Sequence, residues 1–297
     1  MTQSGIRAAS ILIVGATGNV GAELIRQFAT SGKRVKALVR SGDKADGIRH
    51  LAEPVLGDLM EPTTLEAAFK NVERIFILAS PVGEKEETME KNAFHAAIAA
   101  GVKRIVYLSS YPASFGKGYP YVVHAANEKF LGSLKVDWTI LRPTRYMPFL
   151  PFVWSSVLRH GKLLEQAGDG AMTAIDPLDV AAVGIRALTT EGHEGQTYEL
   201  TSEDSFSTRQ LAATLSKVLN KNLIVFDGTT EELRVALLEN GAPGEYASVM
   251  SHYFESVAAG RWKVTDTVER LLGRKPRSYA QWLHSHLPNI LKHSNQY

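Results

Sequence analysis

Short runs of β-branched and other apolar residues alternate with helical segments through the first half of the chain, and this alternation limits the possible folds more than any other feature. The expected strands are residues 11–14, 34–39, 54–56, 74–78, 104–109 and 137–141. Between them, apolar residues recur at helical spacing in residues 20–31, 44–50, 63–69, 86–100 and 121–133. Such alternation is typical of βαβ units. It predicts an α/β fold with a doubly wound parallel sheet of the Rossmann type.

The pattern changes after Pro143. Residues 146–152 are aromatic and interrupted by two prolines, so they cannot form a regular helix and are expected to form a pocket wall or lid. Asp176 is expected to cap the start of a later helix, after which a strand, a helix and a second strand follow and the chain finishes with helices. We therefore predict a sheet domain over residues 1–145. A smaller, mostly helical C-terminal substrate lobe, interleaved with the end of the sheet, is predicted over residues 146–297.

The composition excludes several classes of site and partner. The 297 residues hold 33 basic and 31 acidic side chains, a formal net charge of +2, which provides no strong positive field for nucleic acid. The chain has no cysteine, so disulfides, thiolate catalysis and cysteine-ligated metal sites are excluded. The first apolar run, Ile11 to Val14, is too short for a signal peptide or a membrane span. We expect a cytoplasmic monomer or homodimer with no metal, nucleic-acid or membrane partner.

A glycine-rich segment follows the first expected strand directly. The run Gly15-Ala16-Thr17-Gly18-Asn19-Val20-Gly21 would form a tight turn and open a helix, whose free N–H groups and dipole attract an anion. Glycine spacing alone is a weak signal, because glycines are common in turns. Its position between a strand and a helix favours a dinucleotide cofactor. The residues expected to hold the pyrophosphate are Gly15, Thr17, Gly18, Asn19 and Val20.

The end of the second expected strand indicates which cofactor is bound. A site for NAD carries an acidic residue there, which binds the ribose 2′-hydroxyl. This chain has Arg40, whose guanidinium can bind the 2′-phosphate of NADP in a forked geometry, and Lys44 is close enough in sequence to assist. The alternative is a solvated arginine at a strand end. The lack of an acid favours NADP, and for a reductase NADPH.

Further short segments repeat the order and spacing of motifs in a known family. They are residues 15–21, Val39-Arg40, Gly57-Asp58-Leu59, Ala79-Ser80-Pro81, residues 101–109, Leu141-Arg142-Pro143, and residues 168–179 and 264–282. Together they resemble the NmrA-like branch of the atypical short-chain dehydrogenase/reductases, over nearly the whole chain. The resemblance implies that Asp58 and Leu59 lie by the adenine. It also implies that Ala79, Ser80 and Pro81 pass under the ribose and nicotinamide, and that the backbone around Pro143 lines the nicotinamide end.

The chain departs from that family at the catalytic residues. Standard members carry Tyr-x-x-x-Lys at the start of the helix after the fifth strand, followed four residues later by Glu. Aligning this Glu with Glu128 puts His124 at the lysine position and Pro120 at the tyrosine position, so the usual proton donor is missing. His124, with an ordinary pKa of about 6.5, is one candidate donor, and Tyr111 is a second. The alternative is that His124 is only a packed or solvated helix residue.

The missing acid favours acceptors that need no strong proton donor. Reduction of a simple ketone makes an alkoxide, for which a positioned acid contributes about 10²- to 10⁴-fold. Hydride addition to an iminium or another carbocation cancels charge instead, and addition to a quinone gives a resonance-stabilised phenolate. The resemblance implies the same acceptors, because the NmrA-like branch includes quinone, triphenylmethane-dye and iminium reductases.

Aromatic residues are expected to form a flat, apolar pocket for such an acceptor, although each of them suits ordinary packing equally well. They are Phe115, Tyr146, Phe149 and Phe152. We therefore expect an NADPH-dependent oxidoreductase that transfers hydride to a planar, electron-poor small molecule. The alternative is a non-catalytic, NADP(H)-sensing regulator of the NmrA type, which the missing tyrosine and lysine would also suit.

Overall fold

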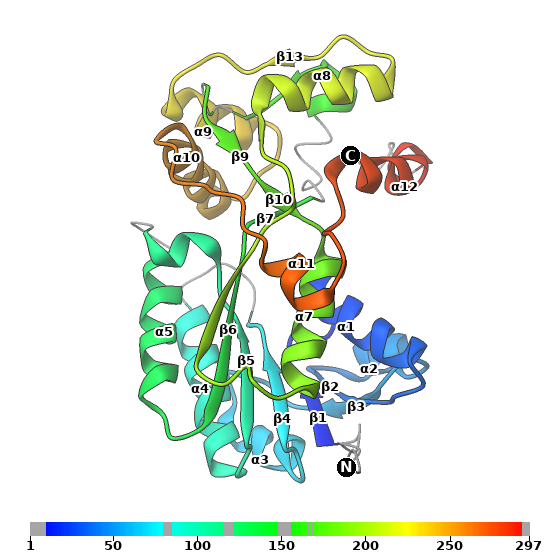
Figure 1. The fold of residues 1–297 in the computed structure, drawn as a ribbon, viewed down its shortest axis with the longest axis vertical. Coiled ribbons are helices and arrows are strands. Elements are labelled where there is room, and N and C mark those ends of the chain that lie inside the picture. The colour runs from blue at the N-terminus through cyan, green and yellow to red at the C-terminus, as the bar shows by residue number, and fades with distance from the viewer. Residues whose placement is uncertain are drawn as a thin grey trace.

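The centre of the molecule is a parallel sheet. The computed structural model describes residues 10–79, 85–115, 121–147, 156–165, 167 and 169–292 (Figure 1). The sheet strands are β1 (Ile11–Ile13), β2 (Lys36–Val39), β3 (Glu53–Leu56), β4 (Arg74–Ile77), β5 (Arg104–Leu108), β6 (Asp137–Pro143) and β11 (Gln196–Leu200). They lie in the order β3-β2-β1-β4-β5-β6-β11, and every neighbouring pair is parallel. The predicted doubly wound sheet is confirmed, with β11 added from the second half of the chain.

Helices cover both faces of this sheet and give it two separate cores. One core holds residues from α1 (Asn19–Thr30), α2 (Gly42–Ile48), α7 (Pro177–Thr189) and α11 (Thr267–Leu272). The other holds residues from α3 (Leu65–Phe69), which follows the short helix η2 (Pro62–Thr64), and from α4 (Glu86–Ala99) and α5 (Tyr121–Ser133). Within β1, Ile11 and Ile13 enter the first core and Leu12 the second, as side chains on a strand alternate. Burial on both faces explains why the strands are apolar throughout.

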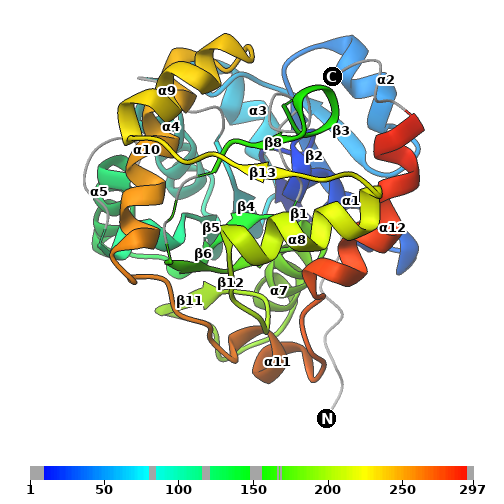
Figure 2. The same cartoon turned by 90° about the horizontal axis from the view of Figure 1, so that it is seen from above.

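A C-terminal lobe lies over the carboxyl ends of the strands (Figure 2). Its helices are α8 (Thr208–Leu219), α9 (Thr230–Glu239), α10 (Gly244–Ala258), α12 (Tyr279–Lys292) and the π-helical turn η4 (Ser156–His160). Its strands form three small pairs, β10 (Ala174–Ile175) with β7 (Arg145–Tyr146), β12 (Phe206–Ser207) with β9 (Ala171–Met172), and β13 (Ile224–Val225) with β8 (Lys162–Leu163). The chain returns from this lobe to the sheet domain for α7, β11 and α11. A division between residues 145 and 146 stays a prediction.

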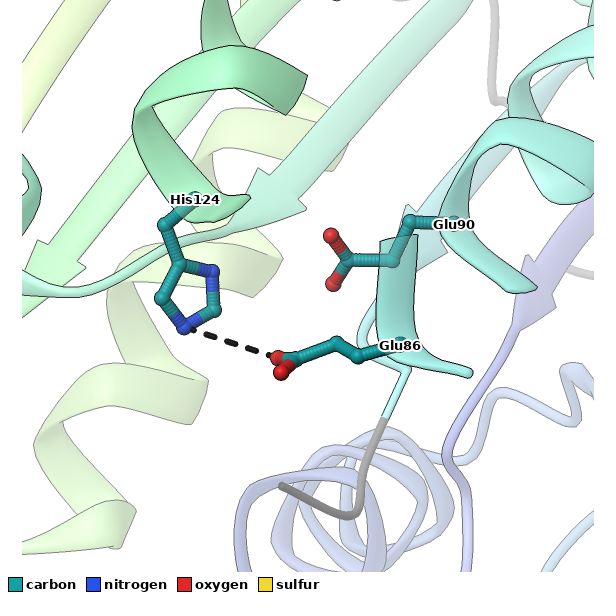
Figure 3. A group of neighbouring side chains, drawn as sticks. All are labelled: Glu86, Glu90 and His124. Atoms are coloured by element: carbon teal, nitrogen blue, oxygen red, sulfur yellow. Dashed lines mark ion pairs between the residues drawn. The ribbon is translucent and has the colours of Figure 1, made fainter. Parts of the chain in front are cut away.

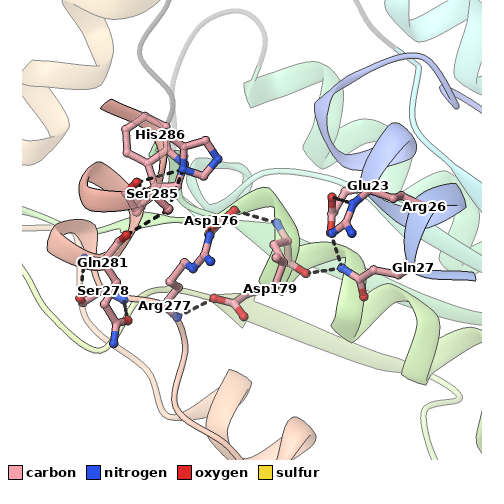
Figure 4. Close-up of polar contacts among 12 residues, drawn as sticks. Glu23, Arg26, Gln27, Asp176, Asp179, Arg277, Ser278, Gln281, Ser285 and His286 are labelled. Carbon is pink, nitrogen blue, oxygen red and sulfur yellow. Dashed lines mark hydrogen bonds and ion pairs between the residues drawn. The ribbon is translucent and has the colours of Figure 1, made fainter. Parts of the chain in front are cut away.

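The start of α7 ties the C-terminal segment to the sheet domain (Figure 4). Asp176 caps α7 by accepting from the N–H of Leu178 at 2.9 Å, as predicted, and also accepts from Arg277 Nη1 at 3.0 Å. Asp179 accepts from the backbone N–H of Arg277 at 2.7 Å. On the other side, Gln27 Nε2 of α1 donates to the Leu178 carbonyl at 3.0 Å. Both aspartates therefore hold the start of α7 and the segment before α12 together, which accounts for them without a catalytic role, and Gln27 joins α7 to α1.

None of the helices in the described ranges combines the length and apolar content needed to cross a bilayer.

Candidate cofactor and active site

The glycine loop joins β1 to α1 at the point where the strand order reverses, because β2 and β4 lie on opposite sides of β1. In parallel sheets this switch point is where ligands bind. Gly15 has φ +78°, a left-handed conformation that favours glycine. Gly18 is the residue before α1, the first turn of α1 contains no acidic side chain, and no side chain caps it. The first N–H groups of α1 and its positive dipole end are therefore free for an anion.

The three glycines of the loop meet different constraints. A Cβ on Gly15 would lie 2.4 Å from the carbonyl oxygen of Leu78, and a Cβ on Gly21 would lie 2.1 Å from that of Gly15. Both glycines are required by close approach of the backbone within the protein. A Cβ on Gly18 would have only the Gly15 oxygen nearby, at 3.4 Å, an ordinary contact. The protein itself leaves room at Gly18, which is what a loop made for a bound pyrophosphate requires.

One cleft brings seven of the predicted cofactor residues together, whereas Gly18, Asn19 and Val20 are not among its lining residues. It is lined by the glycine loop and the ends of β2, β3 and β4, including Gly15, Thr17, Arg40, Lys44, Asp58, Leu59 and Ala79. Arg40 and Lys44 are exposed, and within the described residues neither side chain has a hydrogen-bond or ion-pair partner. Two free cations in the cleft and a free helix N-terminus after the glycine loop suit a ligand with phosphates at both places. A larger groove, about 770 Å³, lies between α8 and β13, away from these strand ends.

The other predicted cofactor residues have structural partners that set their positions. Asp58 Oδ1 accepts from the N–H of Met60 at 2.9 Å, forming an Asx turn after β3. The Leu59 carbonyl accepts from Asn92 Nδ2 of α4 at 2.7 Å. Asn19 is exposed at the start of α1, whereas the Val20 side chain is buried in the core and leaves only its N–H for a ligand.

Some predicted residues lie outside this cleft or outside the described residues. Pro143 is buried at the end of β6, at the same edge of the sheet. Four of the predicted residues lie outside the described ranges: Ser80, Pro81, Phe149 and Phe152. Their roles stay predictions.

His124 is buried in the first turn of α5, with 8% of its surface exposed. Its Nδ1 lies 3.1 Å from the hydroxyl of Tyr107, and its Nε2 lies 3.6 Å from a carboxylate oxygen of Glu86. Burial lowers the pKa of His124 to about 4, because desolvation disfavours the imidazolium, with a smaller opposing effect from Glu128. The expected ordinary pKa is therefore wrong. The imidazole is neutral at neutral pH and is a weak source of a proton by itself.

Tyr111 belongs to an aromatic cluster between the sheet domain and the C-terminal lobe. Its ring stacks on Trp262 with centroids 5.0 Å apart and meets Phe115 at 5.6 Å. The Tyr111 hydroxyl accepts from the backbone N–H of Lys263 at 3.3 Å, and burial raises its pKa. This cluster brings Phe115 and Tyr111 together. Tyr146 lies apart from it, packed against the core that contains α1 and α7.

Three features of the site had no clear sequence signal. Ser110 follows β5, and its buried hydroxyl has no hydrogen-bond partner within the described residues. The Ser-Ser pair after a strand is the only signal that could have found it. Trp262 completes the aromatic cluster from a segment 151 positions after Tyr111. Glu90, fully buried on α4, is the third.

A buried polar cluster lies between α4, α5 and β5 (Figure 3). Polar atoms of Glu86, Glu90 and His124 lie within 4.8 Å of one another, close enough to coordinate one cation. The existing contacts account for the cluster without one. Tyr107 and Asn127 both donate to Glu90 Oε2, at 2.6 and 2.5 Å, and His124 contacts Tyr107.

Comparison with known proteins identifies the family. The sequence profile of the NAD(P)H-binding family matches residues 15–191, which include the glycine loop and Arg40. The chain belongs to this family. It is 30% identical to the NAD(P)H azoreductase of Xenophilus azovorans over 287 residues, 93% of this chain and 97% of that protein. It is 28% identical to quinone oxidoreductase 2 of Escherichia coli over 286 residues, 94% and 99% of the two chains.

Solved structures agree with these relatives. An NADPH-dependent quinone oxidoreductase of Escherichia coli, solved with NADPH, matches with a TM-score of 0.87 at 28% identity, over 94% of this chain and 100% of that one. The triphenylmethane reductase of Citrobacter sp., solved with NADP(H), gives 0.82 at 26% identity, over 93% and 99%. The predicted resemblance, the Rossmann fold and the NAD(P)H cofactor are confirmed. The protein is an NAD(P)H-dependent oxidoreductase.

Proposed function

We propose that the protein transfers hydride from NADPH to a planar, electron-poor small molecule such as a quinone, an azo compound or a triphenylmethane cation. The observation that carries the proposal is the state of His124. The residue at the position of the missing catalytic lysine is buried and neutral, so it cannot serve as a strong acid at neutral pH. Acceptors that need little or no acid from it are the ones that fit.

The preference for NADPH rests on Arg40 and Lys44. Both are exposed, unpaired within the described residues and part of the same cleft as the glycine loop. A forked guanidinium with a nearby ammonium suits a 2′-phosphate dianion. Asp58, which also lines the cleft, already accepts a backbone N–H in its turn.

The acceptor class is supported by the relatives and by the aromatic cluster. The relatives are named for the reduction of azo compounds, quinones and triphenylmethane dyes. Phe115, Tyr111 and Trp262 offer stacked and edge-on rings beside the carboxyl end of β5. The Ser110 hydroxyl, unpartnered within the described residues, is our candidate donor to an acceptor oxygen, and the lobe over residues 146–297 is our candidate substrate lobe. The near balance of charges supports a small-molecule partner over a nucleic acid.

NADPH absorbance in the presence of a panel of quinones, azo dyes and triphenylmethane dyes tests the proposal, with NADH as the matched second cofactor. We expect turnover with at least one class and a preference for NADPH. Tight NADPH binding without turnover of any class would instead favour the non-catalytic sensor.

A further inference from the structure

A buried chain of polar side chains runs between α4, β5 and α5, and the cofactor cleft lies at one end of it. The chain is Glu86, His124, Tyr107 and Glu90 (Figure 3 shows three of the four). Its three contacts span 3.6 Å from Glu86 to His124, 3.1 Å from His124 to Tyr107 and 2.6 Å from Tyr107 to Glu90. All four residues are buried, with at most 8% of their surface exposed. Buried polar groups of this kind are costly unless they are hydrogen-bonded, so their hydrogens must be arranged consistently.

The hydrogen atoms of these four side chains can be arranged in two ways. The Tyr107 hydroxyl has one hydrogen but lies between two acceptors, His124 Nδ1 and Glu90 Oε2. If Tyr107 donates to His124, then Glu90 must be protonated and donate to Tyr107, and His124 Nε2–H faces the Glu86 carboxylate. If Tyr107 donates to Glu90, then His124 Nδ1–H donates to Tyr107, and Glu86 must hold the proton beside Nε2. The two arrangements contain the same number of protons and differ in whether Glu90 or Glu86 holds one of them.

The Glu90 end of the polar chain is close to the candidate cofactor cleft. Met89, the preceding residue, and Ala79, at the end of β4, both line the cofactor cleft. The backbone of Ala79 also acts to lower the pKa of the Glu90 carboxyl group. The second oxygen, Glu90 Oε1, is buried without a hydrogen-bond partner within the described residues. Glu90 itself is fully buried and does not line the cleft, so a proton that it holds lies beside a residue of the cleft wall, Met89.

We propose that Glu86, His124, Tyr107 and Glu90 form a proton relay that supplies the proton accompanying hydride transfer to neutral acceptors; this rests on the proposed function. With a quinone, hydride leaves C4 of NADPH, which becomes NADP⁺, and the quinone is reduced to the hydroquinone monoanion. The relay then gives one proton to the anionic oxygen and leaves Glu90 as a carboxylate. A proton from solvent restores the chain through Glu86 and His124. With a triphenylmethane cation, hydride alone cancels the charge and no proton is consumed.

The surroundings favour storage of a proton on Glu90 at neutral pH. Burial raises the pKa of Glu90 to about 8, partly offset by hydrogen bonds from Tyr107 and Asn127, and the nearby Glu86 raises it further. The other charged neighbour is Glu128 on α5, which accepts from Ser109 at 2.5 Å and from Arg142 Nε at 2.9 Å. Glu128 is thus held in a second, separate cluster and does not join the chain.

Two conservative variants break the relay, and a third serves as the matched control. Glu90→Gln removes the stored proton, and Tyr107→Phe removes the connecting hydroxyl. Ser109→Ala removes a hydroxyl-to-carboxylate hydrogen bond from the neighbouring cluster at the end of the same strand. Each variant is assayed for folding by thermal unfolding, and for kcat with one quinone and one triphenylmethane cation, in H₂O and in D₂O.

We expect Glu90→Gln and Tyr107→Phe each to lower kcat with the quinone at least about tenfold, within the range of acid catalysis, while kcat with the cation changes less than about threefold. Ser109→Ala should leave both within about threefold. Wild-type quinone reduction should show a solvent deuterium isotope effect that Glu90→Gln removes. This test does not depend on Tyr107→Phe, so it remains decisive if that variant does not fold. Equal losses with both acceptors, or no loss with either, would overturn the relay.

Two further outcomes count against the relay in different ways. If wild-type protein binds NADPH but reduces neither acceptor, the proposed function and the relay fall together. If wild-type protein reduces both acceptors and also binds Zn²⁺ tightly, and Glu90→Gln abolishes that binding, the cluster is a metal site and only the relay is overturned.

Discussion

The glycine loop allows a prediction in which two similar substitutions have opposite consequences. In Gly18→Ala, the new Cβ meets only the Gly15 oxygen at 3.4 Å, and the backbone, with φ −83° and ψ 173°, is one that alanine adopts readily. Replacing glycine with alanine stabilises the folded protein by about 0.4–1 kcal/mol, because it reduces the conformational entropy of the unfolded chain. Alanine is a poorer helix N-cap than glycine by an amount of similar size, up to about 1 kcal/mol. The net change in the free energy of unfolding should therefore stay below about 1 kcal/mol.

Cofactor binding should respond differently. The Cβ of Gly18→Ala would occupy space beside the free N–H groups of α1, where the pyrophosphate is expected. Loss of one charge-assisted hydrogen bond costs about 1.5–3 kcal/mol. That corresponds to an NADPH Kd raised about 10- to 150-fold. Titration of NADPH by calorimetry, with thermal unfolding measured in parallel, checks both numbers.

Gly21→Ala is the matched control for this experiment. Its Cβ would lie 2.1 Å from the Gly15 oxygen, so the backbone must move, at a cost of about 1–3 kcal/mol or more in stability. The reasoning is refuted if Gly18→Ala binds NADPH like the wild type, or if it is destabilised as much as Gly21→Ala.

The remaining predictions concern charged and titratable groups. Arg40→Asp should weaken NADPH binding by about 1.5–3 kcal/mol and leave NADH binding unchanged or improved, and equal losses in the two titrations would rule out the 2′-phosphate role. His124→Phe should lower kcat with a triphenylmethane cation less than about tenfold, and the wild-type rate with this acceptor should show no pH inflection near 6.5, because no proton is consumed; a thousandfold loss would show that His124 takes part in hydride transfer itself, which the account excludes. Glu90 has a pKa of about 8 in the folded protein against 4.5 when unfolded, so wild-type stability from this group is lost as pH rises from about 5 to 8. In denaturant titrations the stability of Glu90→Gln relative to wild type should therefore increase over that interval, and a difference independent of pH would contradict the assignment.

Local sequence signals were sufficient for the sheet and for most of the cofactor cleft. The glycine run, the alternation of strands and helices and the missing acid at Arg40 are all properties of short segments, and in a parallel sheet the strand ends necessarily meet at one edge. The cleft that unites Gly15, Arg40 and Asp58 follows from this topology. The caps were predictable for the same reason, since Asp176 and its partner Leu178 are neighbours in sequence.

Contacts between distant segments could not be predicted in this way. The Tyr111–Trp262 stack and the Tyr107–Glu90 hydrogen bond depend on how helices pack on the sheet, and a helix pattern does not specify which residues of two helices will touch. The predicted pKa of His124 was wrong for the same reason. Its shift comes from burial between α4 and α5, which composition and spacing do not reveal.

The central claim is hydride transfer from NADPH to a planar acceptor, and isotope transfer tests it most directly. The protein is incubated with NADPH carrying deuterium on the transferable face of C4 and with a triphenylmethane dye, and the leuco product is examined by mass spectrometry. The account predicts one deuterium on the central carbon of the product for each NADPH oxidised. A product without deuterium, or bound NADPH that is never oxidised by the dye or by any other acceptor of the panel, would contradict it.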